Sequence, residues 1–147
     1  MTIKITEITK GSSKNGFGTG QSNVNHKYEG EVKEGQPHGK GTLCGCHRGS
    51  KIYEGYWEEG KPHGKGTMIY PHHYNKLKKG LKYVGDFVNG EPNGKGTSFH
   101  IYGDIYEGDF VDGRPNGKGI HSKHDGGGTC EGDWVNGKQH GKGILTF

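Results

Sequence analysis

A short segment that recurs five times constrains this chain more than its composition does. The first copy reads Tyr-Glu-Gly-Glu-Val from Tyr28, and a Gly-x-x-x-Gly-Lys-Gly segment follows it. In every copy an aromatic residue or Cys lies two positions before a Gly, and an aromatic residue or Val lies two positions after it. The copies start at Tyr28, Tyr53, Tyr83, Tyr106 and Cys130. The chain is therefore expected to consist of repeated units, each too small to bury a core alone.

Each copy has the alternation of two short strands joined by a turn. In the second copy, Tyr53, Gly55 and Trp57 fall on one face of a strand, and the residues between them fall on the other. The return segment places Gly66 and Met68 on a common face in the same way. The intervening Gly-Lys-Pro-His consists of residues that favour turns, so we expect the turn there. Each copy is predicted to be a β-hairpin.

Glycines inside strands are destabilising unless a neighbouring side chain covers the bare backbone. An aromatic ring on the next strand can do so, and we therefore pair the aromatic columns with the glycine columns. With that pairing Asp86 lies opposite Lys95, and an exposed ion pair of this kind contributes about 0.2–1 kcal/mol. The equivalent expected pairs are Glu31 with Lys40, Asp109 with Lys118 and Asp133 with Lys142.

An isolated hairpin is marginally stable, so adjacent copies must share hydrogen bonds along their strands. The predicted fold is all-β, a single-layer, elongated antiparallel meander of repeated β-hairpins. Five repeats occupy residues 28–147, and residues 1–27 are expected to form a degenerate N-terminal half repeat or cap. An inserted loop is expected at about residues 70–82, between the second and third copies.

The composition is that of a chain without a deep two-layer core, because only 27% of its residues are hydrophobic and 31 are glycine. No stretch approaches the roughly 18 apolar residues of a membrane span, and we expect a soluble, intracellular, cytoplasmic protein. The three cysteines show no framework spacing and are expected to be reduced. The net charge of +4 is too mild to indicate a nucleic-acid partner.

The repeat resembles that of the MORN (membrane occupation and recognition nexus) family, Tyr-x-Gly-x-aromatic followed by Gly-x-x-x-Gly-x-Gly. The second copy fits throughout, whereas Val32 and Cys130 depart from the pattern in the first and fifth copies. The resemblance implies a twisted, curved sheet with an aromatic-lined concave surface. It also implies binding of protein partners, homodimerisation or binding of phospholipid head groups, and an association with cytoskeletal, ciliary or membrane-junction structures.

The aromatic columns are the first candidate for a partner-binding surface. In a one-layer sheet an edge of each ring can shield glycine while its face stays open, and large exposed apolar patches mark interaction sites. We expect this surface to hold a helix or an extended segment of another protein, in a non-catalytic scaffold. Unpaired edge strands also make a homodimer or a larger complex plausible. The candidate residues are Tyr28, Tyr53, Trp57, Tyr83, Phe87, Tyr106, Phe110 and Trp134.

Two alternative functions stay open at this point. A basic segment inside the inserted loop could contact anionic lipid or an acidic partner, and each Lys near a membrane contributes about 1 kcal/mol. Its lysines are Lys76, Lys78, Lys79 and Lys82. The chain would then be a peripheral phospholipid-binding module. The second alternative is a regulatory subunit of an enzyme supplied in trans.

Other chemistry is not expected from the sequence. His38, His63 and His140 occupy equivalent turn positions, but neither they nor the Cys44-Gly45-Cys46-His47 stretch has the spacing of a four-ligand metal site. The glycine-rich segments do not precede a predicted helix, as a phosphate loop must. Carboxylates and histidines are distributed one per copy rather than gathered. We therefore expect no metal, no cofactor and no catalytic residues.

Overall fold

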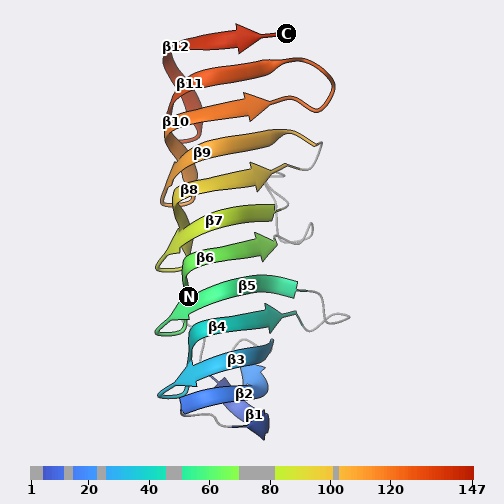
Figure 1. Cartoon of the computed structure of the whole chain (residues 1–147), viewed down its shortest axis with the longest axis vertical. Coiled ribbons are helices and arrows are strands. Elements are labelled where there is room, and N and C mark those ends of the chain that lie inside the picture. The colour runs from blue at the N-terminus through green and yellow to red at the C-terminus, as the bar shows by residue number, and fades with distance from the viewer. Residues whose placement is uncertain (1–4, 12–14, 23–25, 46–50, 70–81, 101–102) are drawn as a thin grey trace. The chain divides into compact units, whose positions relative to one another are not determined.

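The computed structural model describes residues 5–11, 15–22, 26–45, 51–69, 82–100 and 103–147, and within them every regular element is a β-strand (Figure 1). The strands follow one another in chain order in one open antiparallel sheet, which confirms the predicted fold class. They are β1 (Ile5–Gly11), β2 (Asn15–Ser22), β3 (Lys27–Lys33), β4 (Gln36–Cys44), β5 (Lys51–Glu58), β6 (Lys61–Ile69), β7 (Lys82–Val88), β8 (Glu91–Phe99), β9 (Ile105–Val111), β10 (Arg114–Ser122), β11 (Thr129–Val135) and β12 (Lys138–Thr146).

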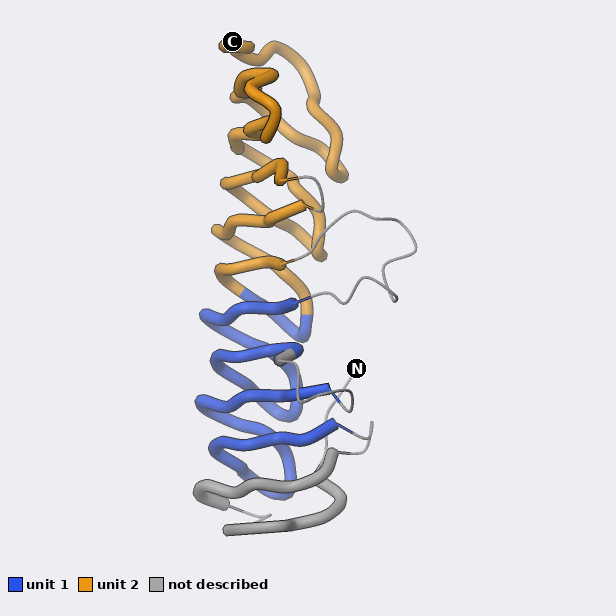
Figure 2. Tube along the Cα trace, turned by 90° about the vertical axis from the view of Figure 1, so that its right-hand side faces the viewer, with its two compact units in different colours: residues 1–69, 87–90 blue, residues 70–86, 91–147 orange. Residues whose placement is uncertain are grey.

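The chain divides into two compact units, coloured separately in Figure 2. Unit 1 comprises residues 1–69 with 87–90, and unit 2 comprises residues 70–86 with 91–147. The part of the expected inserted loop at residues 70–81 lies outside the described residues, and Lys82 is the first residue of β7.

Tight two-residue turns close the hairpins one position earlier than the sequence predicted. Glu59 and Gly60 have φ of 50° and 79°, and Glu58 pairs with Lys61 on either side of them. Two successive residues with positive φ define the type I′ turn that suits the twist of a hairpin. The predicted Gly-Lys-Pro-His turn is thus wrong, because Lys61 and Pro62 already belong to β6. The other turns are Glu34-Gly35, Asn89-Gly90, Asp112-Gly113 and Asn136-Gly137.

The hairpins β3–β4, β5–β6, β9–β10 and β11–β12 each have a bulge beside their central pair of glycines. In the first copy Gly30 pairs with Gly41, and the next paired residues are Val32 and Pro37, so Glu31 faces three residues of β4. Gly39 lies inside this bulge with φ of 86°, a conformation that favours glycine. Bulges bend a strand, and the strands of Figure 1 curve at their turn-side ends.

Tyrosine rings cover glycines of the return strands, as predicted from the sequence. A Cβ added to Gly41 would overlap the Tyr28 ring, and one added to Gly119 would overlap the Tyr106 ring. The Tyr106 hydroxyl donates to the Asp109 carbonyl at 3.2 Å. Burial raises the pKa of Tyr106 to about 12, so the hydroxyl remains a donor at neutral pH. Corresponding contacts join Tyr28, Tyr53 and Tyr83 to the carbonyls of Glu31, Tyr56 and Asp86.

The core of each unit is a run of edge-to-face aromatic contacts between copies. In unit 1 the Trp57 ring lies 5.6 Å from Tyr28 and 4.9 Å from Tyr53, and Phe87 lies 5.1 Å from Tyr53. In unit 2, Phe110 lies between Tyr83 and Tyr106 at 4.9 and 5.2 Å. Each such pair stabilises by about 0.5–1.5 kcal/mol beyond the area that it buries. Stability is therefore built from contacts between neighbouring copies.

The degenerate copy proposed for residues 1–27 remains a prediction. The described backbone there forms β1 and β2, which pair antiparallel, and β2 continues the ladder to β3 with Gly18 opposite Gly30. The glycine column of the repeats therefore has a counterpart at Gly18.

Replacing Trp57 by Ala is expected to reduce the free energy of unfolding by about 3–5 kcal/mol. The side chain is 3% exposed, contacts two tyrosine rings and donates from Nε1 to the Gly41 carbonyl at 3.1 Å. Urea unfolding followed by circular dichroism measures the loss.

The matched control is Tyr56→Ala, because Tyr56 is the preceding aromatic residue and is 50% exposed. Its loss should stay below about 1 kcal/mol. Equal losses from the two variants would contradict a core located on the Trp57 face.

Candidate functional site

Most of the aromatic residues predicted to bind a partner lie in the core. The structure leaves Tyr28, Tyr53, Trp57, Tyr83, Phe87, Tyr106 and Phe110 between 1% and 3% exposed. The expectation that one face of each ring stays open is wrong for these seven, because each side chain is almost fully buried. Trp134 is half-buried, with Nε1 donating to the Gly119 carbonyl at 3.2 Å.

On the face of the sheet opposite the aromatic core, a ladder of carboxylates and lysines joins successive copies. Lys95 pairs with Asp109 of the following copy, and the Lys118 ammonium lies 2.5 Å from Asp133. The predicted ion pairs within one copy, Asp86 with Lys95, Glu31 with Lys40 and Asp109 with Lys118, are wrong as ion pairs. The carboxylate instead accepts the backbone N–H of the lysine in its own copy. Asp109 Oδ2, for example, lies 3.1 Å from the Lys118 backbone nitrogen.

The bulge explains this exchange of partners. The bulge places residues 38–40 opposite Glu31, so that the Glu31 carboxylate accepts the Lys40 N–H at 2.5 Å. On its other side, Lys40 pairs with Tyr56 of the next copy. Asp109 therefore receives two donors, the Lys95 ammonium and the Lys118 N–H. Both hold the pKa of the Asp109 carboxyl below its ordinary value, with the Lys95 hydrogen bond the larger cause.

The glycines leave a groove on the outer face of unit 2. One glycine from each of five strands forms a continuous row, in which Gly96 pairs with Gly108, Gly108 with Gly119, Gly119 with Gly132 and Gly132 with Gly143. Tyr83 and Tyr106 occupy the inward side of this row at Gly96, Gly108 and Gly119, whereas its outward side carries no side chain. The space above it, bounded by side chains on both sides, has a volume of about 760 Å³.

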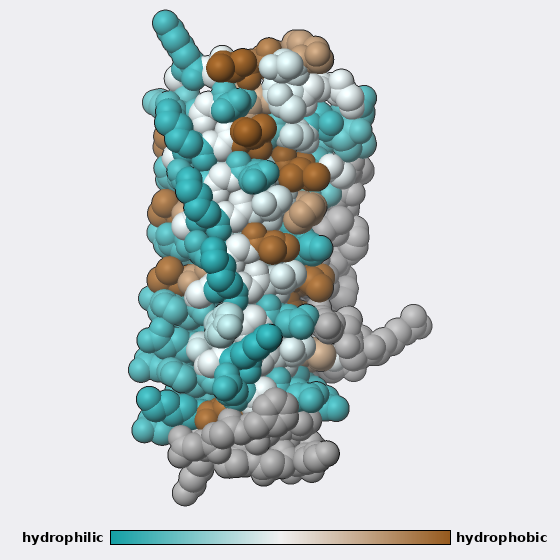
Figure 3. All heavy atoms as spheres, in the orientation of Figure 1, coloured by the Kyte–Doolittle hydropathy of each residue, from teal (hydrophilic) through white to brown (hydrophobic). Residues whose placement is uncertain are grey.

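Two walls of different chemistry border this glycine-floored groove. The first wall is the lysine side of the ladder, Lys95, Lys118 and Lys142. The second wall is Thr97, Glu107, Ile120, Glu131 and Ile144, in which carboxylates alternate with apolar or hydroxyl side chains. In the upper part of Figure 3, which belongs to unit 2, hydrophobic spheres and pale spheres lie beside a line of hydrophilic ones.

The groove was not among the sites predicted from the sequence, although a signal for it existed. Its wall residues are those immediately before and after the paired glycines, and period two places them on the face opposite the aromatics. Exposed apolar residues at such positions, Ile120 at 39% and Ile144 at 65%, indicate a contact surface rather than core.

The lysines of the predicted lipid contact are mostly outside the described residues. This applies to Lys76, Lys78 and Lys79, whereas Lys82 is exposed in β7 with its ammonium 5.0 Å from the centre of the Phe99 ring. The Lys82 ammonium therefore has a cation–π contact within its own chain.

Histidines gather with Asp104 at the loop side of unit 2. Asp104 contacts His121 Nε2 at 3.3 Å and His124 Nδ1 at 3.0 Å, and it accepts the backbone N–H of His124. These contacts, His124 first, hold the pKa of the Asp104 carboxyl below its ordinary value. Ser98 Oγ lies 3.0 Å from His100 Nε2, but Asp104 contacts other histidines, so the side chains do not form a Ser-His-Asp relay.

Within the described ranges, no three His, Cys, Asp or Glu side chains are grouped so that they could hold a metal ion. Cys44 and Cys130 are free thiols, and Cys46 and His47 lie outside those ranges. In the same part of the chain, no helix has the length and apolar character needed to cross a membrane.

The family model of the MORN repeat matches this chain five times, at residues 28–46, 53–71, 83–98, 106–128 and 130–147. These matches begin where the repeat copies begin and cover more than half of the chain, so the protein belongs to the MORN-repeat family. Repeats of this family generally take part in protein or membrane interactions and are typically non-catalytic. A comparison with curated proteins found no match.

Replacing Lys95 by Met is expected to raise the pKa of Asp109 toward its ordinary value, because the hydrogen-bond donor that lowers this pKa most is removed. A carboxyl whose folded pKa is depressed stabilises the fold above its unfolded pKa, and this contribution is lost as the pH falls through the folded pKa. Lys95 is largely exposed, so the stability change at neutral pH should be below about 1 kcal/mol. Carboxyl NMR titration measures the pKa.

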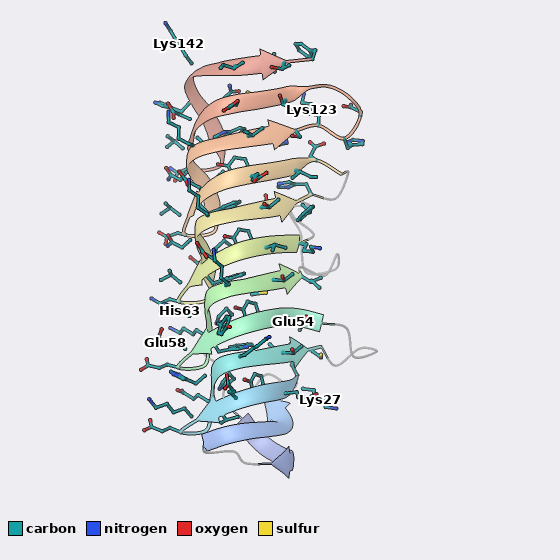
Figure 4. All side chains as sticks on the ribbon, in the orientation of Figure 1. Lys27, Glu54, Glu58, His63, Lys123 and Lys142 are labelled. Carbon is teal, nitrogen blue, oxygen red and sulfur yellow. The ribbon has the colours of Figure 1, made fainter. Side chains whose placement is uncertain are left out.

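Lys142→Met provides the control. Among the described residues Lys142 has no acidic partner, and Figure 4 shows it extending away from β12. Its replacement should leave the Asp109 titration unchanged. A Lys95→Met titration that coincides with that of the unmodified chain would refute the ladder.

Proposed function

We propose that this protein is a non-catalytic scaffold that holds an extended segment of another protein in the glycine-floored groove of unit 2. The observation that carries the proposal is the groove itself, an open channel of about 760 Å³ whose floor is bare backbone and whose wall exposes isoleucine. Exposed apolar side chains beside an open channel are typical of interaction sites.

The dimensions of the groove favour an extended segment over a helix. Its walls are formed by residues two apart on one strand, such as Lys95 and Thr97, whose Cα atoms are separated by about 6.6 Å. A helix with its side chains is about 10–12 Å wide and would rest on the wall tips. A narrower extended segment can lie along the row and place its side chains over the floor between the walls.

The buried aromatic columns support this function without contacting the partner. Because rings such as Tyr106 fill the inner side of the glycine row, the floor is held in a fixed position before a partner binds. A preformed site avoids part of the entropy cost of binding. The predicted role of the aromatic residues as direct contacts is thus replaced by one of support.

An affinity capture from native lysate with Ile120→Asp and Val135→Asp as baits tests the proposal. The two side chains are equally exposed, at 39% and 42%, but only Ile120 borders the groove. We expect a stoichiometric partner to be retained by the unmodified chain and by Val135→Asp, and to be reduced about tenfold by Ile120→Asp, because a buried charge replaces an apolar contact.

Ile120→Thr serves as a milder variant, since Thr97 occupies the equivalent position in the preceding copy. Circular dichroism melts establish that all three baits are folded. Equal recovery of the partner by the Ile120 variants and the unmodified chain would place binding elsewhere. Recovery of anionic vesicles alone, with no protein, would move the function to the membrane surface.

A further inference from the structure

The unpaired carboxylates of the second wall outnumber Lys142, the one unpaired lysine of the first wall in the described part of the chain. Glu107 and Glu131 are exposed, and neither has an ion-pair partner among the described residues. The carboxylates that neighbour the first wall differ, because Asp109 and Asp133 are each paired with a lysine. The second wall is therefore the side of the groove with more unpaired charge.

The spacing of these carboxylates is fixed by the register of the sheet. Ile120 of β10 pairs with Glu107 on one side and with Glu131 on the other. The two carboxylates thus stand two strand spacings apart, about 9.6 Å, with an exposed isoleucine between them. A ligand that follows the groove meets negative charge once per repeat and apolar surface in between.

We infer that the groove selects a basic, extended segment of a partner protein with Lys or Arg at every third residue and apolar residues between them. This inference rests on the proposed function and names the partner's chemistry. A polyproline II segment rises about 3.1 Å per residue with three residues per turn, so every third side chain lies on one face at intervals of about 9.3 Å. That interval matches the distance between Glu107 and Glu131.

Charge also distinguishes such a segment from an anionic lipid surface. Lys95 and Lys118 are committed to Asp109 and Asp133, whereas Glu107 and Glu131 would repel a phosphate group placed over the same floor. Lys142 is the one groove lysine without an acidic partner in the described part of the chain, and it stands at the β12 end. The open carboxylates accordingly favour a cationic ligand.

The test uses a fluorescent peptide of four Lys-Val-Pro triplets, which favour the polyproline II conformation, with binding to the whole chain followed by anisotropy at physiological salt. Glu107→Gln and Glu131→Gln should each weaken binding about threefold, and the double variant about tenfold, as expected for exposed charge pairs. Glu91→Gln is the matched control, because Glu91 is an exposed carboxylate of β8 outside the groove. It should leave the affinity unchanged.

Two further peptides test the spacing and the charge. A peptide of the same composition with its lysines contiguous should bind more weakly, and one with Glu in place of Lys should not bind. Unchanged affinity in the double Gln variant, equal binding of the contiguous peptide, or groove-dependent binding of phosphatidylserine vesicles in place of the peptide would each overturn the inference.

Failure of the inference can be separated from failure of the proposed function. If the triplet peptide does not bind but Ile120→Asp still loses the partner captured from lysate, the groove is the binding site and the basic-segment inference is wrong. If Ile120→Asp retains that partner and the peptide does not bind, both are wrong.

Discussion

The contact between a tyrosine ring and the glycine opposite it determines the rest of this structure. The ring of Tyr106 occupies the place where Gly119 would carry a side chain, so neither residue can be changed alone. The same contact buries the ring, keeps its hydroxyl as a hydrogen-bond donor and aligns each hairpin with its neighbours. A chain with 27% hydrophobic residues can form a core in this way because each ring is shared between two copies.

The groove lies on the other side of the sheet from that contact. The residues before and after each glycine of the row point outward and form the walls, while Tyr106 fills the inner side beneath Gly119. Beside the bulge, the Asp109 carboxylate accepts the Lys118 N–H of its own copy. The same carboxylate also pairs with the Lys95 ammonium of the preceding copy. The interactions that hold copies together thus also neutralise Lys95 and Lys118 of the first wall, and leave Glu107, Glu131 and Lys142 as the charged groove residues without an ion pair among the described residues.

Period-two alternation was sufficient to predict hairpins, their number and the pairing of aromatics with glycines. It was insufficient for the register beyond Gly30, because the bulge around Gly39 adds residues to one strand without changing the alternation of the core positions. The ion pairs predicted within one copy were wrong for that reason, because they assumed a register without the bulge. Burial of Tyr53 and Phe87 was also missed, since it depends on the bend of the strands, which a pattern of polar and apolar residues does not encode.

The copies themselves show which positions are free to change. The glycine that tyrosine covers is present in all five copies, whereas the wall position after it is Thr42, Thr67, Thr97, Ile120 or Ile144. In the fifth copy Cys130 replaces tyrosine, and the Gln139 amide is the group nearest to the place where Gly143 would carry a Cβ, so even this departure keeps the space filled. Wall residues contribute little to the core, and substitutions there can alter what the groove binds while the glycine row and its rings preserve the fold.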